Sequence, residues 1–261
     1  MNAPARRVRA PRNTVPVLAV LAVVGAWQLS GLVLNPILIS TPSEVAQQLF
    51  WLLRWGALQL ALVQSLQEML IGLSCGLAVG IGLGLLMGRY AAVEKVLAPY
   101  VNFFNATPLV VIIPLLVIWV GISLEARLLF IFLVTLWPVL LHTLAGIKNV
   151  HRGYVDVGMA FGLSEAQIVR CISIPAAVPY ILTGVRISAG LAIIGMIVSE
   201  MEVSFVGLGF LLLHFGSSFE TGRLMAVIIV SSLFGIANVL AVKWVQARFF
   251  PWISATAAAA V

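Results

Sequence analysis

The chain has 261 residues, of which 62% are hydrophobic and only 9% are charged, and its formal net charge is +6. A soluble domain carries about 25% charged residues, so this composition excludes a soluble globular protein and indicates one that lipid solvates. In such a protein the basic excess is expected to mark membrane topology rather than nucleic-acid binding. The two cysteines and three histidines do not have the spacing of a metal or redox motif.

Six segments are long and apolar enough to cross a bilayer of about 30 Å, which takes about 20 helical residues. They are residues 14–34, 69–88, 98–120, 128–147, 179–201 and 224–245. The sequence therefore predicts an all-α, polytopic membrane protein with six transmembrane helices. Four arginines precede the first segment, as in a signal peptide, but its apolar run is too long and no small-residue cleavage site follows promptly. We expect an uncleaved first span.

The basic residues are divided unevenly between the two sides that these spans define. If the N-terminus is cytoplasmic, the outer segments hold only Arg54, Arg127 and Arg223, Arg186 lies within the fifth span, and the other Lys and Arg residues are on the inner side. The positive-inside rule then places both termini in the cytoplasm. We expect an N-terminal tail of residues 1–13, a six-span domain of residues 14–247 and a C-terminal tail of residues 248–261.

The connection between the first two spans carries a helix signal. Ser43 is predicted to cap an amphipathic helix on the outer face. Trp51 and Trp55 in this helix suit the membrane interface.

Glycine recurs at every fourth residue of the second span, at Gly72, Gly76, Gly80, Gly84 and Gly88. On a helix this spacing makes a stripe without side chains, which allows another helix to approach closely. The stripe serves either packing within one subunit or a seam between two subunits. Either role is structural.

The third span is interrupted by prolines, which free backbone carbonyls and kink helices. The prolines are Pro99, Pro108 and Pro114, and the polar residues beside them are Asn102, Asn105 and Thr107. Irregular backbone at membrane depth is tolerated where it is buried in protein or faces a water-filled cavity. The segment is therefore either a helix that lines a pathway or a kinked helix whose polar groups bond to neighbours.

Charged residues within the spans are sparse. Glu68, Glu200 and Glu202 are expected near the outer ends of their helices, and Arg186 about two turns inside the fifth span, close enough to snorkel. An ion-driven carrier usually needs an acidic residue at mid-membrane. The pattern instead favours an energy source outside the chain.

The stretch between the fourth and fifth spans, about residues 148–178, is too polar to span and too patterned for a bare loop. Ser164 is predicted to cap a short helix with Ile168 and Ile172 on its apolar face. Gly158 and Gly162 are expected to form the tight turn before it, and Ile174-Pro175 to end it. Such a short helix suits a groove on another protein.

This stretch resembles a loop shared by the permease subunits of binding-protein-dependent ABC importers. Their pattern is Glu-Ala-Ala, three residues, Gly, nine residues, Ile-x-Leu-Pro; here Asp156-Val157-Gly158 is followed at the same spacing by Gly162 and by Ile172-Ser173-Ile174-Pro175. The opening triplet departs from the pattern. The stretches TPSEV, LVVIIPLLVIWVGI, PAAVPYILTGVRISAGLAIIGMIVSEM and VGLGFLL extend the likeness to the nitrate/sulfonate/taurine branch, although Glu68 stands where that branch often has a basic residue.

The resemblance implies a transmembrane permease of a bacterial inner membrane, working as a homodimer in lipid with two ABC ATPase subunits and an extracytoplasmic solute-binding protein. The ATPases would bind ATP and Mg; this chain has no nucleotide-binding GxxxxGK[ST] motif, and we expect neither enzymatic activity nor a cofactor of its own. The expected substrate is a small anion such as a sulfonate, taurine or nitrate. The residues implied for ATPase coupling are Asp156, Gly158, Gly162, Leu163, Ser164, Ile168, Ile172, Ile174 and Pro175. As a prediction of our own, Asn102, Asn105, Thr107 and Ser188 line the translocation path.

Two other classes remain open on the sequence alone. A self-sufficient secondary carrier or channel would need an ionisable site at mid-membrane and no partner. A membrane-embedded enzyme would need a cluster of His, Asp or Glu at one depth, which the sequence does not suggest.

Overall fold

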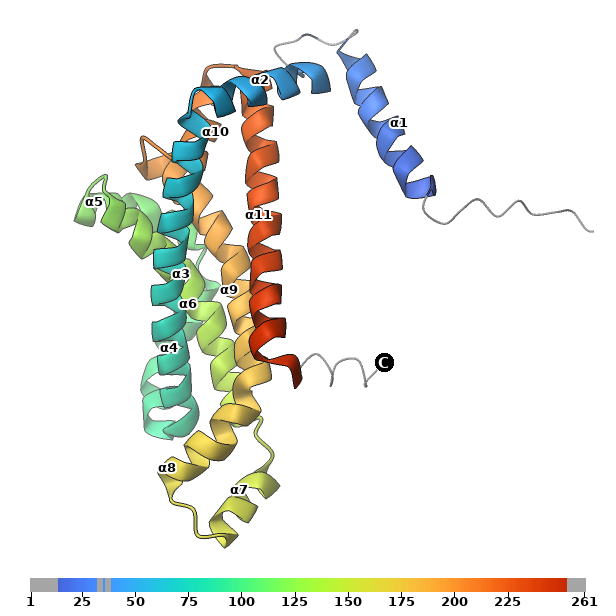
Figure 1. The fold of residues 1–261 in the computed structure, drawn as a ribbon. Coiled ribbons are helices and arrows are strands. Elements are labelled where there is room, and N and C mark those ends of the chain that lie inside the picture. The colour runs from blue at the N-terminus through green and yellow to red at the C-terminus, as the bar shows by residue number, and fades with distance from the viewer. Residues whose placement is uncertain (1–13, 32–34, 36–38, 253–261) are drawn as a thin grey trace, which may run out of the picture. The chain divides into compact units, whose positions relative to one another are not determined.

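The computed structural model describes residues 14–31, 35 and 39–252, so the expected tail of residues 1–13 and most of residues 248–261 lie outside the described residues. Every regular element in the described ranges is a helix (Figure 1), which confirms the all-α prediction. The chain divides into two compact units. The smaller contains the residues up to Leu58 together with Leu212–Ile229, and the larger contains Gln59–Leu211 and the residues from Val230 onwards.

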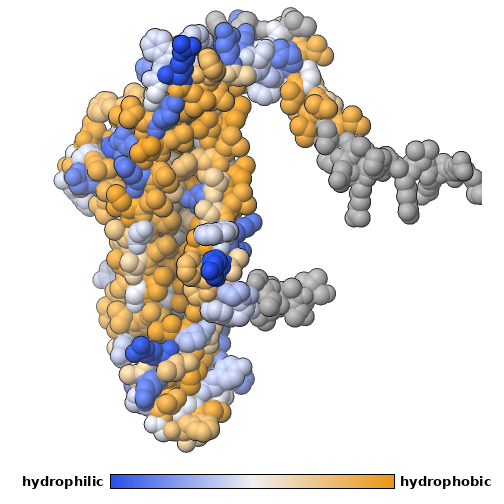
Figure 2. Space-filling model, viewed as in Figure 1, coloured by the Kyte–Doolittle hydropathy of each residue, from blue (hydrophilic) through white to orange (hydrophobic). Residues whose placement is uncertain are grey.

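Four described helices are long and apolar enough to cross a membrane: α3 (Ala57–Arg89), α6 (Leu124–Lys148), Glu165–Val203, and α11 (Thr221–Phe249). A fifth span is possible if α4 (Ala91–Ala106) is counted with η1 (Leu109–Ile112) and α5 (Ile113–Val120), from which it is bent by 96°. The helix α1 (Thr14–Ser30) has 17 residues. Apolar side chains cover the exposed faces of the long helices (Figure 2). The fold is compatible with six spans.

The glycine stripe of α3 packs against α6, within one chain. A Cβ added at Gly72 would come within 2.6 Å of Ile131, and one added at Gly84 would come within 2.6 Å of Thr143. The same steric limit applies along the stripe, where Gly76 faces Thr135, Gly80 faces Val139 and Gly88 faces Ile147. The contacts advance in the same direction on both helices, so α3 and α6 run parallel. The first of the two roles predicted for the stripe, packing within one subunit, is confirmed.

The helix α9 (Ile174–Val203) covers another side of α6 and runs antiparallel to it. Near one end, a Cβ on Gly146 would come within 3.1 Å of Ala177; farther along, a Cβ on Gly184 would come within 2.9 Å of His142. Small residues thus bring the two backbones close, as is typical of helix pairs in membranes. The helix α6 is therefore the central element of the larger unit, between α3 and α9.

In the smaller unit, the predicted amphipathic helix is α2 (Pro42–Arg54). Its N-cap is Thr41, not Ser43 as predicted, because the Thr41 hydroxyl accepts from the Glu44 amide while the Glu44 carboxylate accepts from the Thr41 amide at 2.9 Å. This reciprocal capping box satisfies two amides, which a cap at Ser43 would not do. The indole of Trp27 in α1 donates to the Ser40 carbonyl at 3.0 Å.

Candidate functional site

The polar stretch between α6 and α9 contains two short helices. The first, α7 (Arg152–Ala160), was not predicted; the second, α8 (Glu165–Ile168), begins at the predicted N-cap, Ser164. The Ser164 hydroxyl accepts from the Gln167 amide, and the Gln167 side chain accepts from the Ser164 amide at 2.8 Å. This capping box fixes the start of α8.

The turn between α7 and α8 depends on a glycine with a left-handed backbone. Gly162 has φ +75°, and nothing lies within 4 Å of a Cβ added there, so its conformation and not space requires glycine. The Gly162 amide bonds the Met159 carbonyl at 2.9 Å and the Leu163 amide bonds the Gly158 carbonyl at 3.1 Å. These two bonds form a Schellman motif, which ends α7.

Gly158 has a different role from the predicted one. It is a buried residue within α7 and not part of the turn. A Cβ on Gly158 would come within 2.6 Å of Ile172 Cδ1 and within 3.4 Å of Ile168. The missing side chain therefore lets α7 lie against the segment that follows α8.

The prediction that Ile174-Pro175 ends the short helix is wrong. A π-helical turn at Val169–Ser173 joins α8 to α9, so that Glu165–Val203 is continuous over 39 residues. Pro175 lies in the first turn of α9, where proline lacks only an amide hydrogen that the wider π-turn does not require. The local preference of the residue before proline is overridden here.

One face of this segment exposes large apolar side chains that the sequence analysis missed. Tyr154, Val157 and Phe161 are exposed, Phe161 to 83%. They follow one another at i, i+3 and i+7, the spacing of one helix face, which is the signal that could have identified them. By contrast, Ile168 is buried. The predicted apolar face of α8 thus packs inward, and the exposed apolar surface comes from α7 and its C-terminal turn.

Ion pairs connect neighbouring helix ends to this segment. Arg89, the last residue of α3, pairs with Glu165 in the first turn of α8. Lys148, the last residue of α6, pairs with Glu94 of α4. Both pairs are partly exposed, and such pairs contribute only about 0–1 kcal/mol each. They therefore orient the helix ends more than they stabilise the fold.

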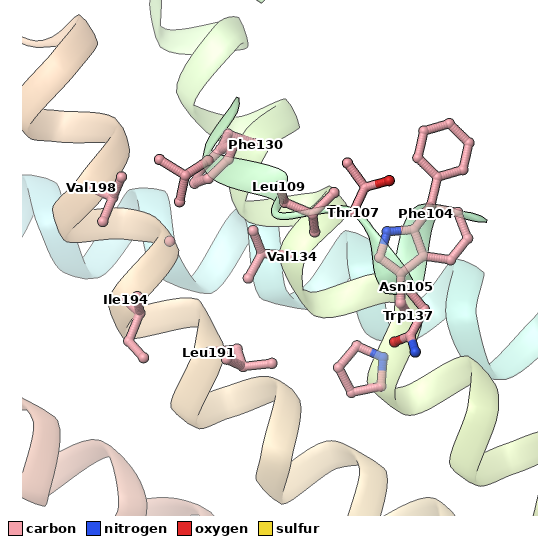
Figure 3. Close-up of a pocket in the computed structure, with 13 residues that line it drawn as sticks. Phe104, Asn105, Thr107, Leu109, Phe130, Val134, Trp137, Leu191, Ile194 and Val198 are labelled. Carbon is pink, nitrogen blue, oxygen red and sulfur yellow. The ribbon is translucent and has the colours of Figure 1, made fainter. Parts of the chain in front are cut away.

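The broken span borders a cavity of about 260 Å³ between α4, η1, α6 and α9. Helix α4 stops at Ala106, and Thr107-Pro108 leads into η1. Figure 3 shows the side chains that line it, all of them uncharged: Phe104, Asn105, Thr107, Leu109, Val110, Phe130, Val134, Trp137, Pro138, Leu191, Ile194, Gly195 and Val198.

Two of the four predicted path residues, Asn105 and Thr107, line this cavity, and the other two do not. Asn102 lies one turn before Asn105 on α4 and is exposed. Ser188 is fully buried between α6 and α9, where its hydroxyl donates to the Thr135 carbonyl at 2.7 Å. Within this chain, Ser188 therefore joins two helices.

A buried polar cluster lies near the first turn of α6 and the last turn of α9. Arg127 donates to both carboxylate oxygens of Glu68, at 2.7 and 2.9 Å, and to the Val203 carbonyl at 3.1 Å. Glu200 accepts from the Ser65 hydroxyl at 2.6 Å and from the Gly209 amide at 2.8 Å.

Glu200 lies near the end of α9, as expected, but the charged groups of this cluster are buried within the protein and paired there. Glu68 and Glu200 are only 2% and 0% exposed, and Arg127 is buried although it was assigned to an outer segment. Arg186 donates to the Gln246 side chain at 2.8 Å. The carboxylates hold helices together: Glu68 joins α3 to α6, and Glu200 joins α9 to α3 and to the start of α10 (Leu208–Ser217).

No group of three or more His, Cys, Asp or Glu side chains suited to a metal occurs among the described residues.

Residues 76–255 match the family described as binding-protein-dependent transport system inner membrane component. The chain is 29% identical to the taurine transport system permease protein TauC of Escherichia coli, over 92% of this chain and 89% of that protein. It is 30% identical to the putative aliphatic sulfonates transport permease protein SsuC of Escherichia coli, over 89% of each. It is 28% identical to the formylaminopyrimidine transport permease protein ThiX of Halalkalibacterium halodurans, over 91% of this chain and 95% of that protein.

Two solved structures share the fold. A chain of the inward-facing MetNI methionine ABC transporter matches with a TM-score of 0.61 at 20% identity, over 75% of this chain and 94% of that one. A chain of an amino acid ABC transporter crystallised with histidines matches with a TM-score of 0.64 at 17% identity, over 77% of this chain and 98% of that one.

Proposed function

This chain belongs to the family of binding-protein-dependent transport system inner membrane components, and from this premise we propose that it forms the solute path of an ABC importer and is driven by a separate ATPase. The fold contains several helices long and apolar enough to span the membrane in which such a permease lies. Its relatives are transport permeases and not enzymes. A second copy of the chain would complete the path.

One observation supports ATPase coupling more than any other: a single continuous helix connects the polar segment with the cavity. Glu165 begins the helix beside the exposed face of α7, and Leu191, Ile194 and Gly195 of the same helix line the cavity. A helix transmits displacement along its axis because its hydrogen bonds run along that axis. A motion imposed on α7 and α8 therefore reaches the cavity wall without an intervening flexible joint.

The exposed apolar face of α7 is the proposed contact with the ATPase. Large exposed apolar side chains on a polar segment mark a protein–protein contact, and aromatic residues such as Tyr154 and Phe161 are typical anchors of such contacts. In this proposal Gly158, Gly162 and Ser164 act indirectly, since they give α7 and α8 their relative position. Each of two ATPase subunits would bind ATP and Mg and engage one copy of this segment.

The proposed substrate is a small anion, such as a sulfonate or taurine, delivered by an extracytoplasmic solute-binding protein. The names of two similar proteins support this class, since they are permeases for taurine and for aliphatic sulfonates. A third is named for formylaminopyrimidine transport, so the named solutes of similar proteins also include a pyrimidine. The uncharged cavity beside Asn105 and Thr107 suits either kind of solute.

Reconstitution into liposomes tests this function. Liposomes that contain the chain, the ATPase that co-purifies with it and a solute-binding protein are expected to accumulate radiolabelled taurine or an alkanesulfonate only when ATP is enclosed on the ATPase side. An ion gradient without ATP is expected to drive no uptake. Uptake by the chain alone under an ion gradient would establish the secondary-carrier alternative instead.

A further inference from the structure

Trp137 carries a buried hydrogen-bond donor that no residue in the described part of the chain accepts. The side chain is only 9% exposed, and its indole nitrogen has no hydrogen-bond partner among residues 14–31, 35 and 39–252. Buried donors are almost always satisfied, because an unpaired donor loses its bonds to water and gains nothing in return. An unpaired buried donor beside a cavity therefore points to a partner that comes from outside the chain.

The ring of Trp137 is held in one orientation. It stacks on Phe104 with the ring centroids 5.1 Å apart and the planes inclined by 8°. Pro138 follows it in α6 and also lines the cavity. Figure 3 shows the indole nitrogen on the side of the ring toward Thr107 and Leu109, which also line the cavity. The donor is thus preorganised, so that a ligand need not order it on binding.

The other polar groups of the cavity define what the donor can recognise. The Thr107 hydroxyl already donates to the Phe103 carbonyl at 2.8 Å. Asn105 lies on the same side of the break and lines the cavity with it. No lining residue is charged, so the cavity recognises a ligand by hydrogen bonding and apolar contact and not by an ion pair.

We propose that the cavity binds the transported solute, and that the Trp137 indole donates to an oxygen of that solute. The solute has an acceptor group, such as a sulfonate, carboxylate or carbonyl oxygen, and an apolar body that lies against Phe130, Val134 and Leu191. This inference deepens the proposed function and rests on it in one respect, that the bound ligand is the solute which the chain transports. The binding itself is independent of that function.

The consequence is selection against solutes that lack the acceptor. A solute of the same shape without an oxygen leaves the indole unpaired, and sites built to hydrogen-bond a group reject analogues that lack it. The membrane permease would then add a second filter to the selection made by the binding protein. This second selection depends on the acceptor oxygen of the solute and not on its charge.

Three soluble probes of similar shape distinguish recognition of an acceptor oxygen from recognition of charge and from apolar filling of the cavity. Benzenesulfonate is anionic and has acceptor oxygens, methyl phenyl sulfone is neutral and has them, and phenyltrimethylammonium has none. The full-length chain is labelled with ¹⁵N at its tryptophan indoles and placed in lipid nanodiscs, and the Trp137 resonance is identified by its absence from Trp137→Phe. Benzenesulfonate and the sulfone are expected to shift the Trp137 indole proton downfield and saturably, whereas phenyltrimethylammonium leaves it unmoved.

Two results would overturn the proposal. One is a Trp137 resonance that does not respond to saturating benzenesulfonate or sulfone. The other is an equal response to phenyltrimethylammonium, which would mean that apolar filling and not an acceptor causes the shift. Binding of benzenesulfonate is expected to weaken about tenfold in Trp137→Phe and to be unchanged in Trp119→Phe, since Trp119 is exposed on α5 and does not line the cavity.

The two proposals can fail separately. If the reconstituted importer takes up solute with ATP but the indole does not respond to either oxygen-bearing probe, only the cavity inference is wrong. If the indole responds as expected but ATP drives no uptake, the cavity binds oxygen-bearing ligands and the importer function is wrong.

Discussion

Gly158 of α7 lies directly against Ile172 of the π-helical turn, so closely that a Cβ on the glycine would come within 2.6 Å of the isoleucine Cδ1. This contact seats the short helix α7 on the start of the long helix that leads to the cavity. In the proposed coupling, a motion of α7 would be passed to α9 through this contact. The size of residue 158 should control this transmission.

Gly158→Val is expected to displace α7 and to reduce ATP-driven uptake strongly, because a branched side chain at this position overlaps Ile172 and Ile168. Gly158→Ala is the graded control. Its single methyl group meets the flexible end of Ile172, so uptake should fall only modestly. Equal uptake by the valine variant and the wild type, at equal membrane abundance, would contradict the seating role.

Gly162 should respond to backbone conformation rather than to side-chain size. Gly162→Val is expected to destabilise the turn by about 1–3 kcal/mol, because a β-branched residue adopts the left-handed region only with strain. Gly162→Asn should retain uptake, because asparagine tolerates this region. Uptake assays on membranes with matched protein levels test this order, and a valine variant as active as the asparagine variant would refute it.

Phe161→Ser is expected to weaken ATPase retention by about tenfold or more, since an aromatic anchor of an interface contributes on the order of 2 kcal/mol. The fold should persist because Phe161 is 83% exposed. Phe205→Ser is the matched control: Phe205 is also exposed, but it lies in the turn between α9 and α10, at the other end of the long helix. Co-purification in mild detergent measures the difference. Loss of the ATPase from both variants, or from neither, would argue against an α7 contact.

The pair formed by Glu68 and Arg127 predicts an asymmetric response to mutation. Glu68→Ala is expected to destabilise the protein by about 3–5 kcal/mol, because it leaves the buried guanidinium without its counter-charge. The double variant Glu68→Leu with Arg127→Met should recover most of this loss, since apolar replacements of a buried pair are often neutral. Thermal unfolding in detergent compares the stabilities of these variants. A double variant less stable than Glu68→Ala would contradict the expected recovery.

Gly195→Leu tests whether the cavity is the path. A Cβ at Gly195 meets Val134 only at an ordinary 3.6 Å, so a leucine there would extend into the cavity and block it without a backbone clash. Uptake should fall at least tenfold while the ATPase remains bound. Gly190→Leu is the matched control on the same helix, because nothing lies within 4 Å of its added Cβ and it does not line the cavity. Unchanged uptake in Gly195→Leu would mean that the solute path does not pass through this cavity.

Features encoded by local spacing were predictable from the sequence. The four-residue period of Gly72 to Gly88 indicated close helix packing, and Ser164 with Gln167 three residues later carries the signature of a capping box. The break at Pro108 was expected as a kink. Its 96° bend was not, because the angle depends on how η1 and α5 pack against α6 and α9.

Features that depend on tertiary contacts were not predictable. Glu68 and Arg127 are 59 residues apart, and their pairing follows from the parallel packing of α3 on α6. The helix continues through Pro175 because a π-turn precedes the proline, which the rule for the residue before proline does not anticipate. The unpaired donor of Trp137 becomes visible only once the residues around it are known.

We propose that the segment of residues 156–175 couples this permease to an ATPase. The measurement that tests it most directly is a pull-down of the chain from its native membrane in mild detergent, with mass spectrometry of the retained proteins. We expect the intact chain to retain an ABC ATPase, and a variant with residues 156–175 scrambled that still reaches the membrane to lose it. Retention of the ATPase by the scrambled variant, or its absence from the intact chain, would show that this segment does not couple the permease to an ATPase.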